Sequence, residues 1–278
     1  MVPEVVREPA VVAVFGAGVM GEALIAGLTR GETPATPPGS ILVADRVNDR
    51  AERVAAKYGA VAATIEDAAS RADTAVLVVK PQDMAALLGA ISPLLRKDSL
   101  VVSLAAGITC NFIADRLPQG HPVVRVMPNT PALVDEGMSA VSPGPSCDEE
   151  HGAEAVRLLA SVGKVITVPE SYLDAVTAIS GSGPAYIFYV VEAMIEAGVL
   201  LGLPRTTANE LVVQTLLGAA VMLRDTGEHP TVLRENVSSP AGTTVAAIRA
   251  LDDHKVRAAF ISAMEAARNR SAELAGGA

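Results

Sequence analysis

Aromatic side chains are almost missing from this chain. Its 278 residues include no tryptophan, and phenylalanine and tyrosine together make up 3% of them, although half of all residues are hydrophobic. The core must therefore be aliphatic, and we expect alanine-rich helices that pack closely. The length allows one large domain or two of ordinary size, and either arrangement can bury a substantial core.

Cysteine and basic residues are also few. The two cysteines, Cys110 and Cys147, have neither CxxC spacing nor a histidine cluster beside them, which excludes a disulfide scaffold and predicts no metal site. The 31 acidic residues outnumber the 22 basic ones, which gives a formal charge of −9 and an isoelectric point near 5.0. Because little basic surface is left to neutralise phosphates, a small molecule is a better candidate ligand than nucleic acid.

The sequence indicates neither a leader peptide nor a membrane span. The first ten residues carry acids where a signal peptide needs basic side chains. The longest charge-free segment, Ala175–Val191, is interrupted by Ser-Gly-Ser-Gly-Pro, which makes it a poor membrane span. We therefore expect a cytoplasmic protein without a membrane partner.

The sequence pattern changes near Pro169. Before it, short β-branched runs alternate with helical patterns, as in a parallel sheet whose strands are covered on both faces. The predicted strands are Val11–Phe15, Ile41–Ala44, Ala75–Val79, Leu100–Leu104, Val123–Val126, Met138–Val141 and Val165–Val168. After it the predicted helices are Tyr172–Ile179, Ala185–Leu201, Thr206–Asp225, Thr243–Leu251 and Lys255–Leu274. We predict an α/β fold: a Rossmann-like, doubly wound parallel sheet over residues 1–168, then an all-helical domain over 169–278.

The predicted helices of the second half are apolar on more than one face. Ala185–Leu203 reads AYIFYVVEAMIEAGVLLGL and Leu211–Leu223 reads LVVQTLLGAAVML. A monomer has too little chain after Pro169 to cover these faces, so we expect helices of a second copy to cover them.

A glycine-rich motif lies near the start of the chain. Val11–Gly21 reads VVAVFGAGVMG, with Gly16, Gly18 and Gly21 in GxGxxG spacing between a strand and a helix. Gly16 allows the tight turn, Gly18 lets backbone N–H groups approach a pyrophosphate, and Gly21 allows close packing of the helix on the strand. The pattern predicts dinucleotide binding, the alternative being ordinary turn glycines of an α/β domain.

The second predicted strand ends at Asp45-Arg46. An acid there commonly binds the adenosine ribose hydroxyls and favours NAD, whereas an arginine just after it can pair with the extra phosphate of NADP. Both are present, so the choice of nicotinamide stays open; Arg46 as an ordinary surface arginine is the alternative.

Other strand ends also lie where open α/β sheets bind ligands. They are Val79-Lys80-Pro81, Ala105-Ala106-Gly107 and Met127-Pro128-Asn129-Thr130-Pro131. Turns built around proline or glycine are the alternative interpretation. For Asn129, between two prolines, we expect a stiff loop that places polar groups beside the nicotinamide.

The helical half offers few candidate acids and bases. His229 lies in an interhelical turn and reads as a cap or surface residue, and Glu192 with Glu196 as an interface pair or a solvated face. His121, His151 and His254 read as surface loop histidines.

The turn Ser238–Thr244, SSPAGTT, is better suited to hold a substrate. Several hydroxyls and the free N–H groups of a helix start converge there, and Gly242 leaves room for a carboxylate. Simple capping by Ser239 or Thr243 is the alternative. A second polar break, Ser180–Pro184, splits a helical segment and offers another set of amides.

Together these motifs resemble one family. Phe15–Leu24, Val79–Gln82, Ser103–Thr109, Arg125–Ala132, Ala178–Tyr186 and Ser238–Thr244 closely resemble pyrroline-5-carboxylate reductases, in the family's order and over nearly the whole chain. The last segment is the most specific of them, and the glycine-rich motif is the least.

The resemblance implies reduction of (S)-1-pyrroline-5-carboxylate to L-proline by NADPH, with NADH as the other donor. It also implies a homodimer formed through the helical domain, often assembled into a decamer. The cofactor contacts that it implies are Gly16, Ala17, Gly18, Val19, Met20, Gly21, Val79, Lys80, Pro81, Ala105, Ala106 and Gly107. The strand-end arguments above add Asp45, Arg46 and Asn129 to the predicted cofactor contacts. The implied substrate contacts are Ser239, Ala241, Gly242, Thr243 and Thr244, with Thr244 near the ring nitrogen as the catalytic candidate.

Two positions depart from the family's pattern. Ala241 stands where the family often has glycine, which is tolerated unless the position needs a positive φ. Asp45 weakens the expectation of NADPH. Two other functions stay open: a β-hydroxyacid dehydrogenase-like enzyme, which uses a lysine that Ser171–Pro204 lacks, and a non-catalytic NADP-binding regulatory module.

Overall fold

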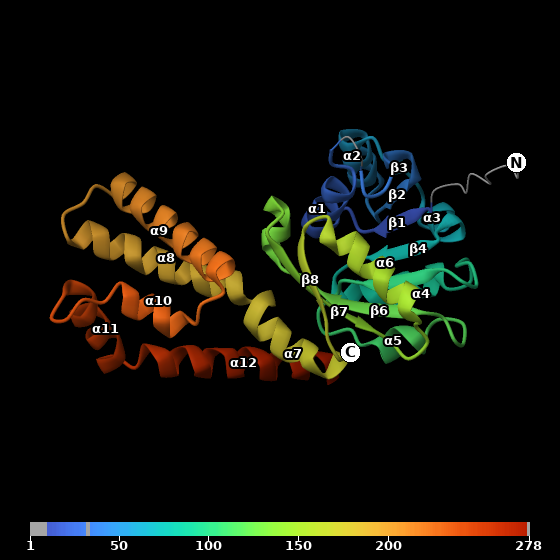
Figure 1. Ribbon diagram of the computed structural model, residues 1–278. Helices are drawn as coiled ribbons and strands as arrows, with labels where there is room; N and C mark the ends of the chain where they lie inside the picture. Colours follow the sequence, from blue (N-terminus) through green and yellow to red (C-terminus); the bar gives the residue numbers. More distant parts are fainter. Residues whose placement is uncertain (1–9, 32–33, 277–278) are drawn as a thin grey trace, which may run out of the picture. The chain divides into compact units, whose positions relative to one another are not determined.

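The computed structural model describes residues 10–31 and 34–276 and divides the chain into two compact units (Figure 1). The first unit runs to Ser182 and includes the chain again from Ala267 onward, and the second is Gly183–Ala266. The sequence pattern changes at residue 168, whereas the compact units divide between Ser182 and Gly183. The first helical turns after Pro169 and the end of the last helix thus belong with the sheet.

An eight-stranded sheet forms the centre of the first unit. Its strands, in the order 3-2-1-4-5-6-7-8, are β1 Val12–Phe15, β2 Ile41–Ala44, β3 Val61–Ala62, β4 Thr74–Leu77, β5 Leu100–Ser103, β6 Val123–Met127, β7 Gly137–Pro143 and β8 Gly163–Thr167. Strands β1 to β6 are parallel to one another, as predicted. The sheet is not parallel throughout, because β7 pairs antiparallel with β6, while β8 pairs parallel with β7. Because the strand order reverses between β1 and β4, the carboxyl ends of these two strands flank the site where such sheets bind nucleotides.

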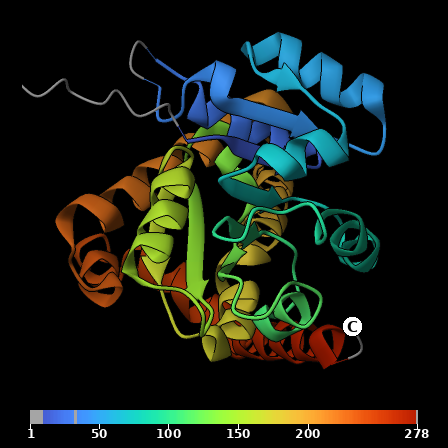
Figure 2. The same ribbon diagram turned by 90° about the vertical axis from the view of Figure 1, so that its right-hand side faces the viewer.

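Helices cover both faces of this sheet (Figure 2). They are α1 Val19–Leu28, α2 Asn48–Tyr58, α3 Ile65–Arg71, α4 Met84–Ile91, α5 Cys110–Ala114 and α6 Glu149–Ala160. Aliphatic side chains of α1, α2 and α6 pack on one face, and those of α3, α4 and α5 pack on the other. Every residue of β1, β2, β4 and β5 is buried, as their Val-rich sequences predict.

Local sequence explains where several of these helices begin and end. Thr64 and Thr109 accept hydrogen bonds from the N–H groups of Asp67 and Phe112, which caps α3 and α5. Gly59, with φ of +69°, ends α2 in the left-handed conformation that favours glycine.

The polar segment Ser180–Pro184 does not split its helix, contrary to the sequence prediction. After α7 (Leu173–Val176), the residues Thr177–Gly181 form a π-helical turn, in which the N–H of Ser182 donates to the carbonyl of Thr177 at 2.8 Å. The helix then continues into α8 (Gly183–Leu200). Wider π-helical hydrogen bonding thus replaces the predicted break.

The second unit is helical. It contains α8, α9 (Arg205–Thr226), α10 (Pro230–Asn236), α11 (Thr243–Asp253) and the first half of α12 (Val256–Gly276). Of these, α10 has no counterpart among the predicted helices, nor has β3 among the predicted strands. Helices α8 and α9 pack closely at small residues, since a Cβ on Gly198 would lie 2.8 Å from that of Ala208.

Large apolar side chains are exposed on α8 and α9. Phe188 is 66% exposed, Tyr189 74% and Leu200 88%, and α8 has no buried residue. The predicted excess of apolar surface is therefore present. The segments Glu170–Leu200 and Arg205–Thr226 are also long and apolar enough, by length and composition alone, to cross a membrane.

Candidate cofactor and substrate sites

The glycine loop lies between β1 and α1 in the geometry that its sequence predicts. Gly16 has φ of +114°, and a Cβ there would lie 2.5 Å from the carbonyl oxygen of Val78. A Cβ on Gly21 would collide with the carbonyl of Gly16, whereas one on Gly18 meets nothing within 4 Å. Gly16 and Gly21 are thus required by packing, and Gly18 faces open space.

The first turn of α1 has no side-chain cap. Gly18 is its N-cap and cannot supply one, and Val19 beside it is 66% exposed. An uncapped helix start beside open space fits the pyrophosphate of a dinucleotide, because backbone N–H groups and the helix dipole both favour an anion there.

The other predicted cofactor residues follow neighbouring parallel strands. Val79, Lys80 and Pro81 follow β4, with Lys80 exposed, and Ala105, Ala106 and Gly107 follow β5, with Gly107 at φ of +75°. Since Phe15 of β1, Leu77 of β4 and Ser103 of β5 share one register, the chain leaves these strands at the same edge. The topology brings these segments together around the glycine loop.

Asp45 and Arg46 differ in their surroundings. The carboxylate of Asp45 accepts hydrogen bonds from the N–H groups of Ala17 and Val47, both at 2.8 Å, and its side chain is 8% exposed. The side chain of Arg46 is 83% exposed, and its Nη1 lies 3.5 Å from Oδ1 of Asp83. The carboxylate of Asp45 is thus held by backbone N–H groups, whereas the guanidinium of Arg46 faces solvent.

The side chain of Asn129 is held by the protein at both ends. Its Nδ2 donates to the carbonyl of Ser180 at 3.1 Å, and its Oδ1 accepts from the N–H of Met138 at 2.8 Å. Pro184 has no N–H and cannot supply the α-helical donor for the Ser180 carbonyl, so the amide of Asn129 provides one. Sequence reasoning places this side chain beside the nicotinamide; the structure shows it fixing the β6–β7 loop to the π-helical turn.

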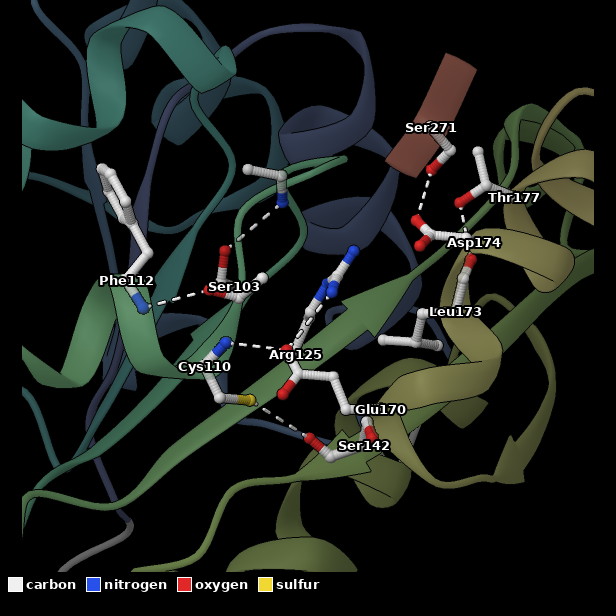
Figure 3. Close-up of polar contacts among 12 residues, drawn as sticks. Ser103, Cys110, Phe112, Arg125, Ser142, Glu170, Leu173, Asp174, Thr177 and Ser271 are labelled. Atoms are coloured by element: carbon white, nitrogen blue, oxygen red, sulfur yellow. Dashed lines mark hydrogen bonds and ion pairs between the residues drawn. The ribbon is translucent and has the colours of Figure 1, made fainter. Parts of the chain in front are cut away.

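A buried polar cluster lies beside this region, and sequence reasoning missed it (Figure 3). Arg125, whose side chain is 6% exposed, forms an ion pair with Glu170 at 3.2 Å, and the same carboxylate oxygen accepts from the N–H of Cys110 at 2.8 Å. Burial, with a contribution from the charge of Glu170, raises the pKa of Cys110 to about 12. Cys110 is therefore a packed thiol and not a nucleophile. A charged residue within an otherwise Val-rich strand was the available signal for Arg125.

The histidines are mostly structural. His229 caps α10 by accepting from the N–H of Thr231, as expected, and His151 completes a capping box with Asp148 at the start of α6. The prediction that His121 is a surface residue was wrong, because it is 4% exposed and its Nε2 lies 3.4 Å from the hydroxyl of Ser99. Burial lowers the pKa of His121. In the described residues no three His, Cys, Asp or Glu side chains gather in a way that fits a metal.

The substrate turn of the second unit is a tight turn followed by an uncapped helix. The N–H of Gly242 donates to the carbonyl of Ser239 at 2.9 Å, with Pro240 and Ala241 between them. Gly242 is the N-cap of α11, and neither Ser239 nor Thr243 caps the helix with its side chain. The alternative that these hydroxyls only cap the helix is therefore not realised. A Cβ on Gly242 would lie 2.6 Å from the hydroxyl and 3.0 Å from the carbonyl oxygen of Ser239, so a larger residue would have to displace the side chain of Ser239.

Ala241 adopts the conformation in which the family's glycine matters. Its φ is +58°, within the left-handed region that a Cβ disfavours. Proline at the second position and a positive φ at the third are the features of a type II turn. The condition under which alanine is unfavourable here is thus met.

Comparisons with known proteins agree with these features. Residues 170–274 match the family model for pyrroline-5-carboxylate reductase dimerisation, and residues 11–107 match that for coenzyme F420-dependent NADP oxidoreductases. The chain is 47% identical over 267 residues to a pyrroline-5-carboxylate reductase of Corynebacterium melassecola, covering 95% of this chain and 98% of the relative. It is 41% identical over 261 residues to the reductase of Arabidopsis thaliana, covering 94% of each.

Solved structures extend the similarity to the whole fold. The pyrroline-5-carboxylate reductase of Coxiella burnetii superimposes with a TM-score of 0.90 at 36% identity, covering 96% of this chain and 99% of that one. The Plasmodium falciparum enzyme, solved with NADP bound, gives a TM-score of 0.85 at 26% identity, covering 96% and 98%. With relatives matched over nearly their full length, and with both the nucleotide loop and the uncapped turn in place, the chain belongs to the pyrroline-5-carboxylate reductase family.

Proposed function

We propose that this protein reduces (S)-1-pyrroline-5-carboxylate to L-proline with hydride from NADPH, NADH being the alternative donor. The observation that carries the proposal is the uncapped start of α11 at Gly242, within the turn whose sequence is most specific to the family. It offers free N–H groups to a carboxylate, and the substrate carries a carboxylate next to its ring nitrogen.

Each part of the substrate has a candidate partner in this turn. Backbone N–H groups of Thr243 and Thr244 and the hydroxyl of Ser239 bind the carboxylate. The hydroxyl of Thr244 lies near the ring nitrogen and orients it. The substrate reacts as its iminium ion, which accepts hydride strongly, so orientation supplies most of the acceleration and no dedicated acid is required.

The sheet domain holds the dinucleotide, which supplies the hydride when bound. The uncapped start of α1 and the open space at Gly18 hold its pyrophosphate, and the segments after β4 and β5 flank its nicotinamide half. Among the predicted contacts, Ala17 and Asp45 act by shaping the loop, since they bind each other, and Asn129 acts through the position of its loop.

A second copy of the chain covers the exposed faces of α8 and α9. These faces lie in the part of the chain that matches the dimerisation model, and this favours protein over lipid as their partner. The working unit in this proposal is a cytoplasmic homodimer, and the decamer known from the family is its further assembly. Light scattering tests this directly, because a monodisperse monomer at working concentration contradicts it.

The reaction is tested by following NADPH absorbance when pyrroline-5-carboxylate is added. We expect consumption of NADPH with the pyrroline and none with 3-hydroxy acids, since Ser171–Pro204 contains no lysine to act as the base for alcohol oxidation. Binding of NADPH without turnover would instead indicate the regulatory module.

The Thr244→Ala variant tests the turn. It should lower kcat more than it weakens NADPH binding, because the hydroxyl contacts substrate and not cofactor. The matched control is Thr231→Ala, an exchange of the same type in the neighbouring helix α10, which should leave kcat unchanged. Unchanged kinetics in Thr244→Ala would refute the role.

A further inference from the structure

Each carboxylate oxygen of Asp45 accepts a hydrogen bond from a backbone N–H group, one of them in the glycine loop. Its Oδ2 accepts from the N–H of Ala17, and its Oδ1 accepts from the N–H of Val47. One residue earlier, the carbonyl of Ala44 accepts from the N–H of Gly16 at 2.8 Å. The end of β2 is therefore joined to the glycine loop by two successive hydrogen bonds.

The charge of Asp45 is also offset within the protein. Nη1 of Arg50, in the first turn of α2, lies 3.4 Å from both carboxylate oxygens. An acid that selects NADH must present a free oxygen to the ribose 2′-hydroxyl and repel a phosphate at that position. Asp45 is 8% exposed, accepts two N–H groups and faces a guanidinium, so it meets neither requirement.

Arg46 is placed differently. Its side chain is 83% exposed, and its only ion pair in the described part of the chain is with Asp83, in the turn after β4. Both side chains are exposed and the separation is 3.5 Å, so the pair is weak. A phosphate dianion carries more charge than a carboxylate and can displace Asp83 from the guanidinium.

We propose that Asp45 is a positioning residue of the glycine loop and that Arg46, whose weak ion pair with Asp83 a phosphate can displace, selects a 2′-phosphorylated cofactor. This assignment rests on the proposed function, since it concerns the cofactor of that reaction. Asp45 alone would favour NADH and Arg46 would favour NADPH; with these roles, the end of β2 favours NADPH.

The test is binding of two cofactor fragments, 2′,5′-ADP and 5′-AMP, to the full chain by calorimetry without substrate. In Arg46→Ala we expect 2′,5′-ADP to bind about tenfold more weakly, which corresponds to about 1.4 kcal/mol, and 5′-AMP to be unaffected. In Asp83→Asn the affinity for 2′,5′-ADP should rise about threefold, because the competing carboxylate is gone. Arg71→Ala, which removes an arginine from an exposed ion pair on α3, is the matched control and should change neither affinity.

The Asp45→Asn variant separates the two roles of the acid. An asparagine turns its NH₂ group toward one of the two N–H donors, so a positioning role predicts weaker binding of both fragments by a similar factor. Tighter binding of 2′,5′-ADP together with weaker binding of 5′-AMP would show that the carboxylate selects the ribose, and would overturn the proposal. Circular dichroism checks that this variant folds.

If Asp45→Asn does not fold, the variants Arg46→Ala and Asp83→Asn still test the proposal. Equal losses of both fragments in Arg46→Ala, or weaker binding of 2′,5′-ADP in Asp83→Asn, overturn the assignment. The calorimetry uses no pyrroline, so its result does not depend on turnover. If the fragments bind as expected but the protein fails to reduce pyrroline-5-carboxylate, the proposed reaction is refuted and the inference about Arg46 stands.

Discussion

The sheet of the first unit buries its apolar side chains, whereas helices α8 and α9 of the second unit expose theirs. Strands β1, β2, β4 and β5 are buried at every residue, between helices that complete two cores. Helix α8 buries none of its residues, and α9 buries Ala208 and Val212 only. The first unit thus supplies its own core, whereas the second leaves large apolar side chains exposed on α8 and α9.

A deletion in the sheet domain should have the largest effect on stability. Leu88 on α4 is fully buried in the cluster under one face of the sheet. We expect Leu88→Ala to lower the free energy of unfolding by about 2–5 kcal/mol, because it removes apolar contacts and leaves a cavity. Urea denaturation at fixed protein concentration measures this, and light scattering should show an unchanged assembly. A loss below about 1 kcal/mol would mean that this core is not closely packed.

A charge on the exposed face of α8 should act on assembly instead. Phe188→Asp places a carboxylate where the side chain is 66% exposed, so the fold of one copy loses little. If the second copy covers this face, the dimer should dissociate at least about 30-fold more readily, as for other buried aromatic contacts. Sedimentation over a dilution series measures it. Leu94→Asp, at an exposed leucine in the turn after α4, is the control that should leave the assembly intact.

The pH dependence of stability should reveal a buried histidine in the sheet domain. Burial lowers the pKa of His121 from 6.5. As the pH falls, the imidazole is therefore protonated at a higher pH in the unfolded chain than in the folded one. Stability is then complete above pH 6.5 and falls as the pH drops below it, by at most about 1.4 kcal/mol per pH unit from this group. His121→Gln should flatten this part of the curve. Identical curves for the two proteins would exclude the effect.

The comparison also explains what the sequence could predict. Buried strands follow from the pattern, because continuous aliphatic runs such as Ile41–Ala44 are typical of parallel strands covered on both faces. The two-residue strand β3 and the short helix α10 carry too little periodicity to be recognised. The segment Ser180–Pro184 has the composition of a break, yet its helix continues because a π-helical turn and the amide of Asn129 satisfy the backbone groups.

For the candidate sites, motif spacing predicted positions but not partners. The glycine loop and the turn before α11 lie in the predicted local structures, because glycine and proline restrict the backbone directly. Asp45 and Asn129 each have one partner far away in the sequence, Ala17 and Ser180 respectively. The ion pair of Arg125 with Glu170 spans β6 and the turn before α7 in the same way. Such long-range contacts leave no periodic signal in the chain.

The smallest expected effect concerns the turn of the second unit. Ala241 has φ of +58°, where a Cβ costs about 1–2 kcal/mol. Replacing it with glycine removes this strain but also raises the conformational entropy of the unfolded chain, which offsets part of the stabilisation. Ala241→Gly should therefore stabilise the protein by about 0.5–1 kcal/mol, an increase that thermal unfolding can resolve. The control is Ala247→Gly, within α11, which should destabilise it by about 1 kcal/mol because glycine weakens a helix interior. Opposite signs for the same exchange six residues apart would show that backbone conformation at the turn, and not alanine content, determines stability here, whereas equal losses would mean that Ala241 is not strained.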